Sequence, residues 1–377
     1  EDEVLRSSLS WKIIKRKNTI QIKAAHFIEK IDYQDSLTSI FANNVANSFF
    51  GEVSVRRKFS KVLSSDIGVL NTYTSAKTDN YLTVIGENRL AIFALLKHGL
   101  MKGKLSYLLS SRGELVSTRT IVPTASAQIK GIISSWLSVK VKAGSLYRYP
   151  SINDLHWSPG GNINLLPEKG YSGEIGLVIS KNTKYFTFRS EVTWFNKKVN
   201  DWIAWVPSGS YWSPENINKV WSRGLESVSK VSFTKKGVVL SAGLNTNYVL
   251  STNESTTAFG NSFQKQLIYV PRYTGGAWMS LGYKKAQLKY QHSYTGYSFT
   301  SSDNTEFIAP FDLASLGAYY HVSKGKYGVQ SFFKIENIWG TEYKRIANYP
   351  MPLVSCSFGI QVAFKKSLKV KKVGSVN

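Results

Sequence analysis

Hydrophobic and polar side chains alternate along most of the chain. In the last clear segment, Phe358, Ile360 and Val362 occupy alternate positions, and Ser357 and Gln361 fall between or beside them. The same period of two recurs near positions 20, 140, 190 and 240. Because successive side chains of a strand point to opposite faces, this alternation predicts an all-β protein whose strands have one apolar and one polar face.

The length of the alternating segments narrows the fold class. Strands of soluble domains are typically about five or six residues long, whereas a tilted strand needs about 9–11 residues to cross a bilayer. The segments here are about ten residues or longer, which favours a transmembrane antiparallel β-barrel over a soluble sandwich. A helical membrane protein is excluded, because the most apolar helix-like run, residues 90–96, is followed directly by Lys97 and His98.

The connectors between the predicted strands alternate between short and long. Short turns, most of which carry Lys or Gly, are expected near residues 15–18, 59–62, 99–103, 133–136, 181–184, 234–237, 283–286 and 323–326. Long loops are expected near residues 31–45, 76–87, 113–122, 149–170, 206–216, 252–268, 297–310 and 340–354. Outer-membrane barrels sort their connectors in this way, with short periplasmic turns and long extracellular loops.

This pattern gives about 17 strands in one domain. Because bacterial barrels normally have an even number of strands, we expect the chain to begin inside a barrel whose first strands lie upstream of residue 1. The predicted organisation is a barrel domain over residues 1–364, incomplete at its N-terminal end, and a basic tail over residues 365–377.

The chain is strongly basic, with 48 Lys and Arg against 24 Asp and Glu, a net charge of +24. Such an excess suggests an anionic partner, and nucleic acid is one candidate. The basic residues are scattered singly along strands and turns rather than on one helix face, so we interpret them as solvated turn and lumen residues with no nucleic-acid role. Attraction to an anionic lipid surface is also consistent with a membrane location.

The sequence offers no candidate catalytic or metal centre. The five histidines lack metal-ligand spacing, the one cysteine, Cys356, has no partner, and no nucleophile or phosphate-binding motif is present. We therefore expect no enzyme activity, no metal and no cofactor. Some Trp residues, such as Trp194 and Trp278, fit an interfacial aromatic girdle. The candidate ligand contacts, in or beside two neighbouring long loops, are Trp157, Asn162, Trp205, Tyr211 and Trp212.

A series of ordered motifs resembles the TonB-dependent receptors, in particular the cobalamin- and siderophore-receptor-like members. The similar segments are residues 147–155, 161–169, 214–220, 223–226, 269–272, 336–343 and 350–352, and an alternating last strand that ends at Phe364. The residues that match the family motifs are Arg148, Pro150, Asn153, Pro167, Glu168, Asn216, Arg223, Gly224, Glu226, Asn337, Glu342, Tyr343, Pro350 and Phe364.

The resemblance implies a parent barrel of about 22 strands with an N-terminal plug domain in its lumen. It implies an outer-membrane receptor that takes up a large nutrient, such as cobalamin or an iron-siderophore, with TonB-derived energy. The expected partners are outer-membrane lipid, a small-molecule nutrient, and the TonB complex and plug domain through a missing N-terminal region; the expected state is a monomer. Two departures are the residues beyond Phe364 and the run 352–354, where the family usually has Gly-Arg after the proline.

Two other functions remain open from the residues alone. A passive porin-like channel would have similar strands and loops, although it would need a complete, even-stranded barrel. A soluble β-rich protein that binds polyanions would account for the net charge of +24.

Overall fold

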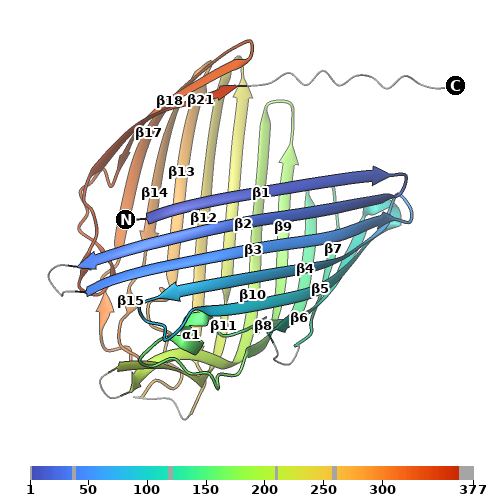
Figure 1. The fold of residues 1–377 in the computed structure, drawn as a ribbon. Coiled ribbons are helices and arrows are strands. Elements are labelled where there is room, and N and C mark those ends of the chain that lie inside the picture. Colours follow the sequence, from blue (N-terminus) through green and yellow to red (C-terminus); the bar gives the residue numbers. More distant parts are fainter. Residues whose placement is uncertain (1, 36–39, 118–121, 209–210, 257–260, 365–377) are drawn as a thin grey trace. The chain divides into compact units, whose positions relative to one another are not determined.

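The computed structural model describes residues 2–35, 40–117, 122–208, 211–256 and 261–364 (Figure 1). Seventeen long strands belong to one sheet, and they range from 9 residues in β7 (Thr124–Ile132) to 25 in β11 (Tyr211–Lys235). The predicted strand number and strand length are therefore confirmed. In the described residues, no helix is both long enough and apolar enough to span a membrane. The predicted tail, 365–377, lies outside the described residues.

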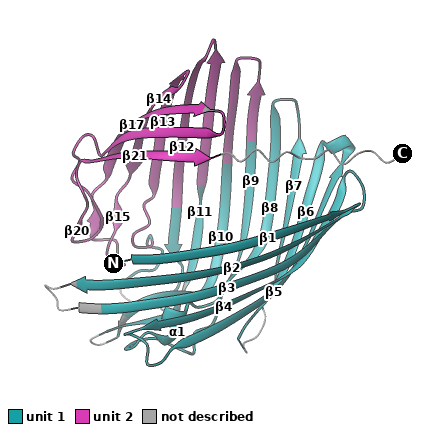
Figure 2. Ribbon diagram, turned by 45° about the horizontal axis from the view of Figure 1, so that its top comes forward, with its two compact units in different colours: residues 1–177, 193–224, 250–266 teal, residues 178–192, 225–249, 267–377 magenta. Residues whose placement is uncertain are grey.

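The chain divides into two compact units, coloured separately in Figure 2. Unit 1 comprises residues 1–177, 193–224 and 250–266, and each of its strands from β1 to β8 pairs antiparallel with the next one in sequence. Besides β7, its complete elements are β1 (Asp2–Lys15), β2 (Asn18–Asp35), β3 (Ile40–Lys58), β4 (Leu63–Thr78), β5 (Ile85–Leu100), the 3-10 turn η1 (Met101–Gly103), β6 (Leu105–Val116), β8 (Leu137–Arg148) and the helix α1 (Ile152–His156).

Unit 2 comprises residues 178–192, 225–249 and 267–377. Its strands β13, β14, β17, β18 and β21 follow one another as an antiparallel meander that begins at β12. Its complete elements are β13 (Tyr273–Tyr283), β14 (Ala286–Thr295), β15 (Ser298–Phe299), β16 (Phe307–Ile308), β17 (Phe311–Lys324), β18 (Tyr327–Glu336), β19 (Lys344–Ile346), β20 (Tyr349–Pro350) and β21 (Ser355–Phe364). Parts of β9 (Glu168–Asn182), β10 (Phe186–Ser208), β11 and β12 (Val238–Asn253) belong to each unit.

The strand pairing sorts side chains onto two faces, as the alternation predicts. In unit 2, Leu281 pairs with Leu288 on an apolar face, and the next pair along the ladder, Ser280 and Lys289, lies on the polar face. Large apolar side chains on the first face are exposed, Ile360 by 62%. The sheet therefore keeps one side apolar with no other part of the described chain covering those side chains.

All eight predicted short turns are confirmed as hairpin connections. In the β11–β12 turn, Lys236 and Gly237 both have positive φ, 47° and 79°. Two central residues with positive φ are the signature of a tight hairpin turn whose twist matches the strands, and glycine adopts this conformation without a Cβ penalty.

The predicted boundaries of two long loops were wrong, because the strands extend further. Asp32 pairs with Asn43 and Tyr33 with Ala42, well inside the predicted loop 31–45. Likewise, β10 and β11 extend to Ser208 and from Tyr211, within the predicted loop 206–216. A hairpin ladder needs only backbone N–H and C=O groups, so it continues through polar sequence that lacks a clear apolar face.

The buried apolar core is small and lies in unit 1. It contains Val116, Tyr149, Leu155, Leu165 and Ile203, gathered around α1. This core lies in the long-loop region of the unit rather than between layers of sheet, so it holds the loops in place.

Candidate functional site

The helix α1 in unit 1 organises the loop between β8 and β9, residues 149–167. Ser151 Oγ accepts from the backbone N–H of Asp154 at 3.2 Å, and the Ser151 N–H donates to Asp154 Oδ2 at 2.9 Å, which makes a reciprocal capping box. Tyr81 donates its hydroxyl to Asn153 Oδ1 on the same helix. Burial raises the pKa of Tyr81, so this hydroxyl stays protonated and able to donate at neutral pH.

Arg148, Glu168 and the α1 residue Asp154 form a charged network beside this helix. Arg148 Nε donates to Glu168 Oε2 at 2.8 Å, and the backbone N–H of Ile203 donates to the other oxygen of the same carboxylate at 3.0 Å. Asp154 lies 3.6 Å from Arg148 and accepts from the indole N–H of Trp205 at 3.0 Å. Glu168 and Asp154 are both buried. Each buried carboxylate therefore has a cation and a further donor, which offsets the cost of removing it from water.

Two asparagine side chains connect the same loop to neighbouring strands. Asn162 Nδ2 donates to the carbonyl of Pro214 at 3.2 Å. Asn216 accepts from the N–H of Leu166 at 2.7 Å and donates to its carbonyl at 2.9 Å, and Asn216 also donates to the carbonyl of Asp201 at 2.8 Å. Where the loop crosses the strands, these side-chain amides bond to the backbone groups that a neighbouring strand would bond in a regular ladder.

A close backbone approach at Gly160 brings two aromatic segments together. Gly160 has φ of 120°, and a Cβ added there would lie 2.2 Å from the carbonyl oxygen of Trp212 and 3.3 Å from the ring of Tyr211. Ser213 Oγ donates to the Gly160 carbonyl at 2.8 Å. The segment that follows Trp157 therefore lies against the start of β11.

The structure brings most of the predicted ligand contacts into this one region of unit 1, but in different roles. The polar groups of Trp205 and Asn162 are already used in the hydrogen bonds above. Trp157 is half-buried, whereas Tyr211 and Trp212 are exposed. A ligand-contact role for these residues stays a prediction, and it is best placed on Tyr211 and Trp212, whose side chains are accessible.

The motif arginine Arg223 stacks on an aromatic ring. Its guanidinium carbon lies 3.7 Å from the ring centroid of Trp221, and Nη1 donates to Thr252 Oγ1 at 3.0 Å. The Trp221 indole N–H donates to Asn196 at 3.1 Å, and Lys198 Nζ lies 4.9 Å from the ring. Two cations flanking one indole hold this part of β11 in place.

The other motif residues outside the segment 336–352 differ in their burial. Pro150 and Gly224 are buried and Pro167 is half-buried, while Glu226 and Phe364 are exposed. Phe364 packs edge-on against Tyr327 at a centroid distance of 5.5 Å.

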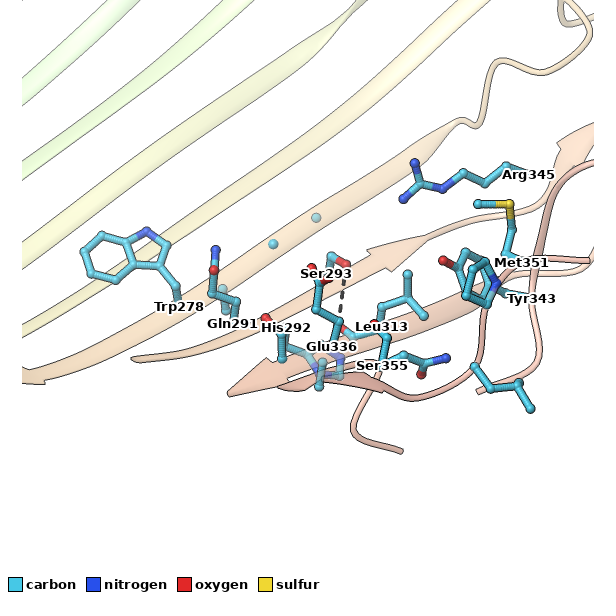
Figure 3. A pocket seen from close by; sticks show the side chains of 18 of the residues that line it. Trp278, Gln291, His292, Ser293, Leu313, Glu336, Tyr343, Arg345, Met351 and Ser355 are labelled. Atoms are coloured by element: carbon cyan, nitrogen blue, oxygen red, sulfur yellow. Dashed lines mark hydrogen bonds between the residues drawn. The ribbon is translucent and has the colours of Figure 1, made fainter. Parts of the chain in front are cut away.

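A pocket of about 520 Å³ lies wholly within unit 2, lined by residues of β13, β14 and β17 and of the segment 337–354 (Figure 3). Trp278 and Gln291 line one end of it, and Tyr343, Arg345 and Met351 line the other. Its volume falls in the range of about 300–1,000 Å³ that is usual for small-molecule sites. Polar groups, aromatic rings and one cation therefore converge on a space of ligand size.

The pocket loop is held by local contacts. Asn337 is buried, has φ of 50°, and bonds both the N–H and the carbonyl of Thr341 at 2.9 Å. Tyr343 packs against Phe311 at 5.0 Å, and the Arg345 guanidinium lies 6.0 Å from the Tyr343 ring. These contacts aim Tyr343 at the pocket.

A second pocket of about 880 Å³ adjoins the first in unit 2 and shares Tyr343, Met351 and Leu353 with it. Glu342 and Pro350 line this second pocket. Asn337, Glu342, Tyr343 and Pro350 match the family motifs in the sequence, but their position at a pocket was not predicted. Their clustering at 336–343 and 350–352 was the signal that could have done so.

No group of three or more His, Cys, Asp or Glu side chains that could hold a metal ion occurs in the part of the chain that the structure describes. The candidate sites are thus concave surfaces lined by aromatic, amide and charged side chains.

Comparison with known proteins identifies the fold and the family. The family model described as TonB dependent receptor-like, beta-barrel, matches residues 14–338. The chain is 26% identical over 198 residues to the vitamin B12 transporter BtuB of Photobacterium profundum, covering 51% of this chain and 30% of that protein. It is 30% identical over 96 residues to BtuB of Vibrio vulnificus (strain YJ016), covering 25% and 15%.

Solved structures of receptors and transporters share the fold. A mutant of the ferric enterobactin receptor PfeA from Pseudomonas aeruginosa superposes with a TM-score of 0.72 at 14% identity, covering 96% of this chain and 62% of that one. The siderophore receptor PiuA from Acinetobacter baumannii gives 0.73 at 13% identity, covering 96% and 64%. The matched region thus spans less than a third of the curated relatives and about three fifths of these solved chains. The predicted antiparallel barrel fold is confirmed, and the chain belongs to the TonB-dependent receptor-like β-barrel family.

Proposed function

We propose that the chain is the barrel portion of an outer-membrane receptor that takes up a large nutrient, such as cobalamin or an iron-siderophore, with TonB-derived energy. The family match over residues 14–338 supports this function. The relatives described as vitamin B12 transporters, and the structural neighbours described as a ferric enterobactin receptor and a siderophore receptor, support the substrate classes.

The main support for a membrane location is the exposed apolar face of the long strands. In β21, Phe358 and Ile360 are 69% and 62% exposed, and they lie in register with Phe333 and Ser331 of β18. An apolar surface that continues from strand to strand would cause association in water, whereas acyl chains cover it without cost.

Candidate nutrient contacts are proposed in each unit separately, among its own long loops. In unit 2, the pocket between Trp278 and Tyr343 offers aromatic surface, amide groups and the Arg345 cation. In unit 1, Tyr211 and Trp212 offer accessible aromatic surface beside the ordered α1 loop. Aromatic and amide groups suit a large ligand that presents both apolar and hydrogen-bonding groups. The plug domain and the TonB complex would act through an N-terminal region of the whole protein.

Uptake by the whole protein tests this proposal. The full-length protein would be expressed in a bacterial host that lacks its own receptors for cobalamin and iron-siderophores, with and without an intact TonB system. We expect uptake of radiolabelled cyanocobalamin or of an iron-55 siderophore above the empty-vector level, and loss of that uptake without TonB. Uptake that persists without TonB, or large open conductance of the full-length protein in planar bilayers, would instead support a passive channel.

A further inference from the structure

Exposed lysines are concentrated at the short turns of unit 2. Four hairpin turns, at residues 181–185, 234–237, 283–286 and 323–327, contain no Asp or Glu. The exposed lysines at these turns, called the lysine row below, are Lys181, Lys184, Lys235, Lys236, Lys284, Lys285 and Lys326. Along the sequence these residues are scattered, and their spacing alone predicts only lysines on solvated turns. Because every second connection of an antiparallel meander lies at the same edge of the sheet, these turns lie beside one another.

The turns adjoin one another in space. The N–H of Thr234 donates to the Tyr185 carbonyl at 2.8 Å, and the N–H of Lys284 donates to the Gly237 carbonyl at 3.3 Å. The N–H of His321, near the last turn, donates to the Lys285 carbonyl at 2.8 Å. These bonds connect each turn region to the next, so the lysine row is one continuous basic edge.

The opposite end of unit 2 has a different charge balance. Its long loops and adjoining strand ends combine the acidic residues Asp303, Glu306 and Glu342 with the basic residues Lys344 and Arg345. The positive charge of this unit is therefore concentrated at the short-turn edge rather than spread evenly over both ends.

Exposed tyrosines accompany the lysine row. Lys184 Nζ and Lys235 Nζ lie 5.2 and 5.9 Å from the ring of Tyr185, and Lys284 Nζ lies 5.0 Å from the ring of Tyr283. Both tyrosines are exposed, and the exposed apolar face begins at Leu281, two residues from Tyr283 on the same strand. The order from the edge inward is therefore cation, amphipathic ring and apolar side chain.

Unit 1 has the same arrangement at one of its own short turns. Arg57 and Lys58 precede the exposed Phe59 in the β3–β4 connection, and the Arg57 guanidinium lies 5.4 Å from that ring. Lys61 follows in the same turn and is exposed. Arg56 differs, because it is paired with Asp66 at 2.7 Å.

We propose that the lysine row binds the headgroups of an anionic phospholipid leaflet. A soluble polyanion would be attracted by the charge alone, but it would have no use for the tyrosines and apolar side chains that follow. A bilayer presents phosphate, interface and acyl chain in the same order as the three kinds of side chain, and lysine stems can lie along the apolar surface while their ammonium groups reach the phosphates. This inference rests on the membrane location in the proposed function.

Lipid selection by the purified chain tests the inference. The detergent-solubilised chain would be incubated in mixed micelles that contain equal amounts of phosphatidylglycerol and phosphatidylcholine with identical acyl chains, then repurified, and its bound lipids quantified. We expect about threefold enrichment of phosphatidylglycerol at low ionic strength, and a loss of most of this enrichment in about 0.5 M salt, because salt screens exposed charges.

Matched variants separate the lysine row from net charge. The variant K235Q/K236Q/K284Q/K285Q should reduce the enrichment to about onefold, since the attraction of a basic segment grows with each cation near the surface. Replacing the same four lysines by arginine should preserve the enrichment. The control variant K169Q/K219Q/K265Q/K344Q removes the same charge from lysines outside the row, and it should stay near the unmodified value.

Three results would overturn the inference. One is an unmodified chain that binds the two lipids equally, and another is an equal loss of enrichment in the control variant. A third is displacement of phosphatidylglycerol by a single-stranded oligonucleotide, which would indicate a polyanion site. If the chain took up no lipid of either kind, the membrane location in the proposed function would fail as well, whereas uptake without preference would refute the lysine row alone.

Discussion

Individual side chains in unit 1 hold the long loops in fixed positions. The carboxylate of Glu168 is buried and receives hydrogen bonds from Arg148 and from the N–H of Ile203. By contrast, Lys142 and Glu174 form an ion pair at 3.4 Å in which both side chains are substantially exposed. Both pairs join a cation to a glutamate, so the burial of Glu168 and its additional hydrogen bonds should separate their contributions to stability.

Substituting Glu168→Gln should lower the free energy of unfolding by about 2–3 kcal/mol, because it removes a charge-assisted partner of Arg148 in a buried position. The matched substitution Glu174→Gln should change it by less than about 1 kcal/mol, since exposed pairs are screened by water. Urea unfolding in detergent micelles, followed by tryptophan fluorescence, measures both values. Equal effects would show that the Arg148–Glu168 pair contributes no more than a surface pair.

Gly160 is a second residue with a specific requirement. Gly160→Ala would place a methyl group against the carbonyl oxygen of Trp212, at a φ that residues with a Cβ rarely adopt. We therefore expect the free energy of unfolding to fall by at least about 1 kcal/mol and the loop 157–162 to be displaced. Gly173→Ala is the control, because nothing lies within 4 Å of a Cβ at that position. Limited proteolysis should cleave the Gly160→Ala loop faster than the unmodified loop, while the Gly173→Ala chain should match the unmodified one.

Within a single strand, adjacent residues point to two chemically different faces of the sheet. Ile360 and Gln361 are neighbours near the middle of β21, and they point to opposite faces of the sheet. Both are exposed in the isolated chain. The face that carries Ile360 continues on β18 through Val329 and Phe333, whereas Gln361 pairs with Gln330 on the other face.

Ile360→Arg should therefore destabilise the protein folded in phospholipid vesicles by about 2–4 kcal/mol, as expected for a cation placed against the bilayer interior. Gln361→Arg adds the same side chain one residue away, on the polar face, and should cost less than about 1 kcal/mol, because lumen-facing positions accept polar groups. The measurement is the denaturant midpoint of the full-length protein in vesicles. A larger loss for Gln361→Arg would reverse the assignment of the two faces.

At the scale of the whole molecule, the exposed apolar face decides behaviour in solution. Without detergent or lipid, the chain should associate, because continuous apolar surface of this extent is rare on soluble monomers. In detergent micelles it should elute as a single monodisperse species. Size-exclusion chromatography with light scattering distinguishes the two states, and a compact monomer in detergent-free buffer would contradict the membrane assignment.

Within unit 2, the short-turn edge and the long-loop end differ in charge. The four turns of the lysine row contain no Asp or Glu, while the two pockets of the same unit are lined by residues of both charges. Under the proposed function, this difference would separate contact with lipid headgroups from nutrient recognition, because the two place different demands on charge and shape.

Alternation, turn composition and local motifs are properties of neighbouring residues, so the sequence was sufficient to predict the strands, the eight short turns and the family. The capping residues Ser151 and Asp154 were also visible locally, although α1 was not predicted. The pairing of Arg148 with Glu168, the hydrogen bond from Arg223 to Thr252, the pocket beside Tyr343 and the continuity of the lysine row were not predictable. Each depends on the register between strands and on how loops pack, and register joins residues that are distant in sequence and carry no local signal of one another.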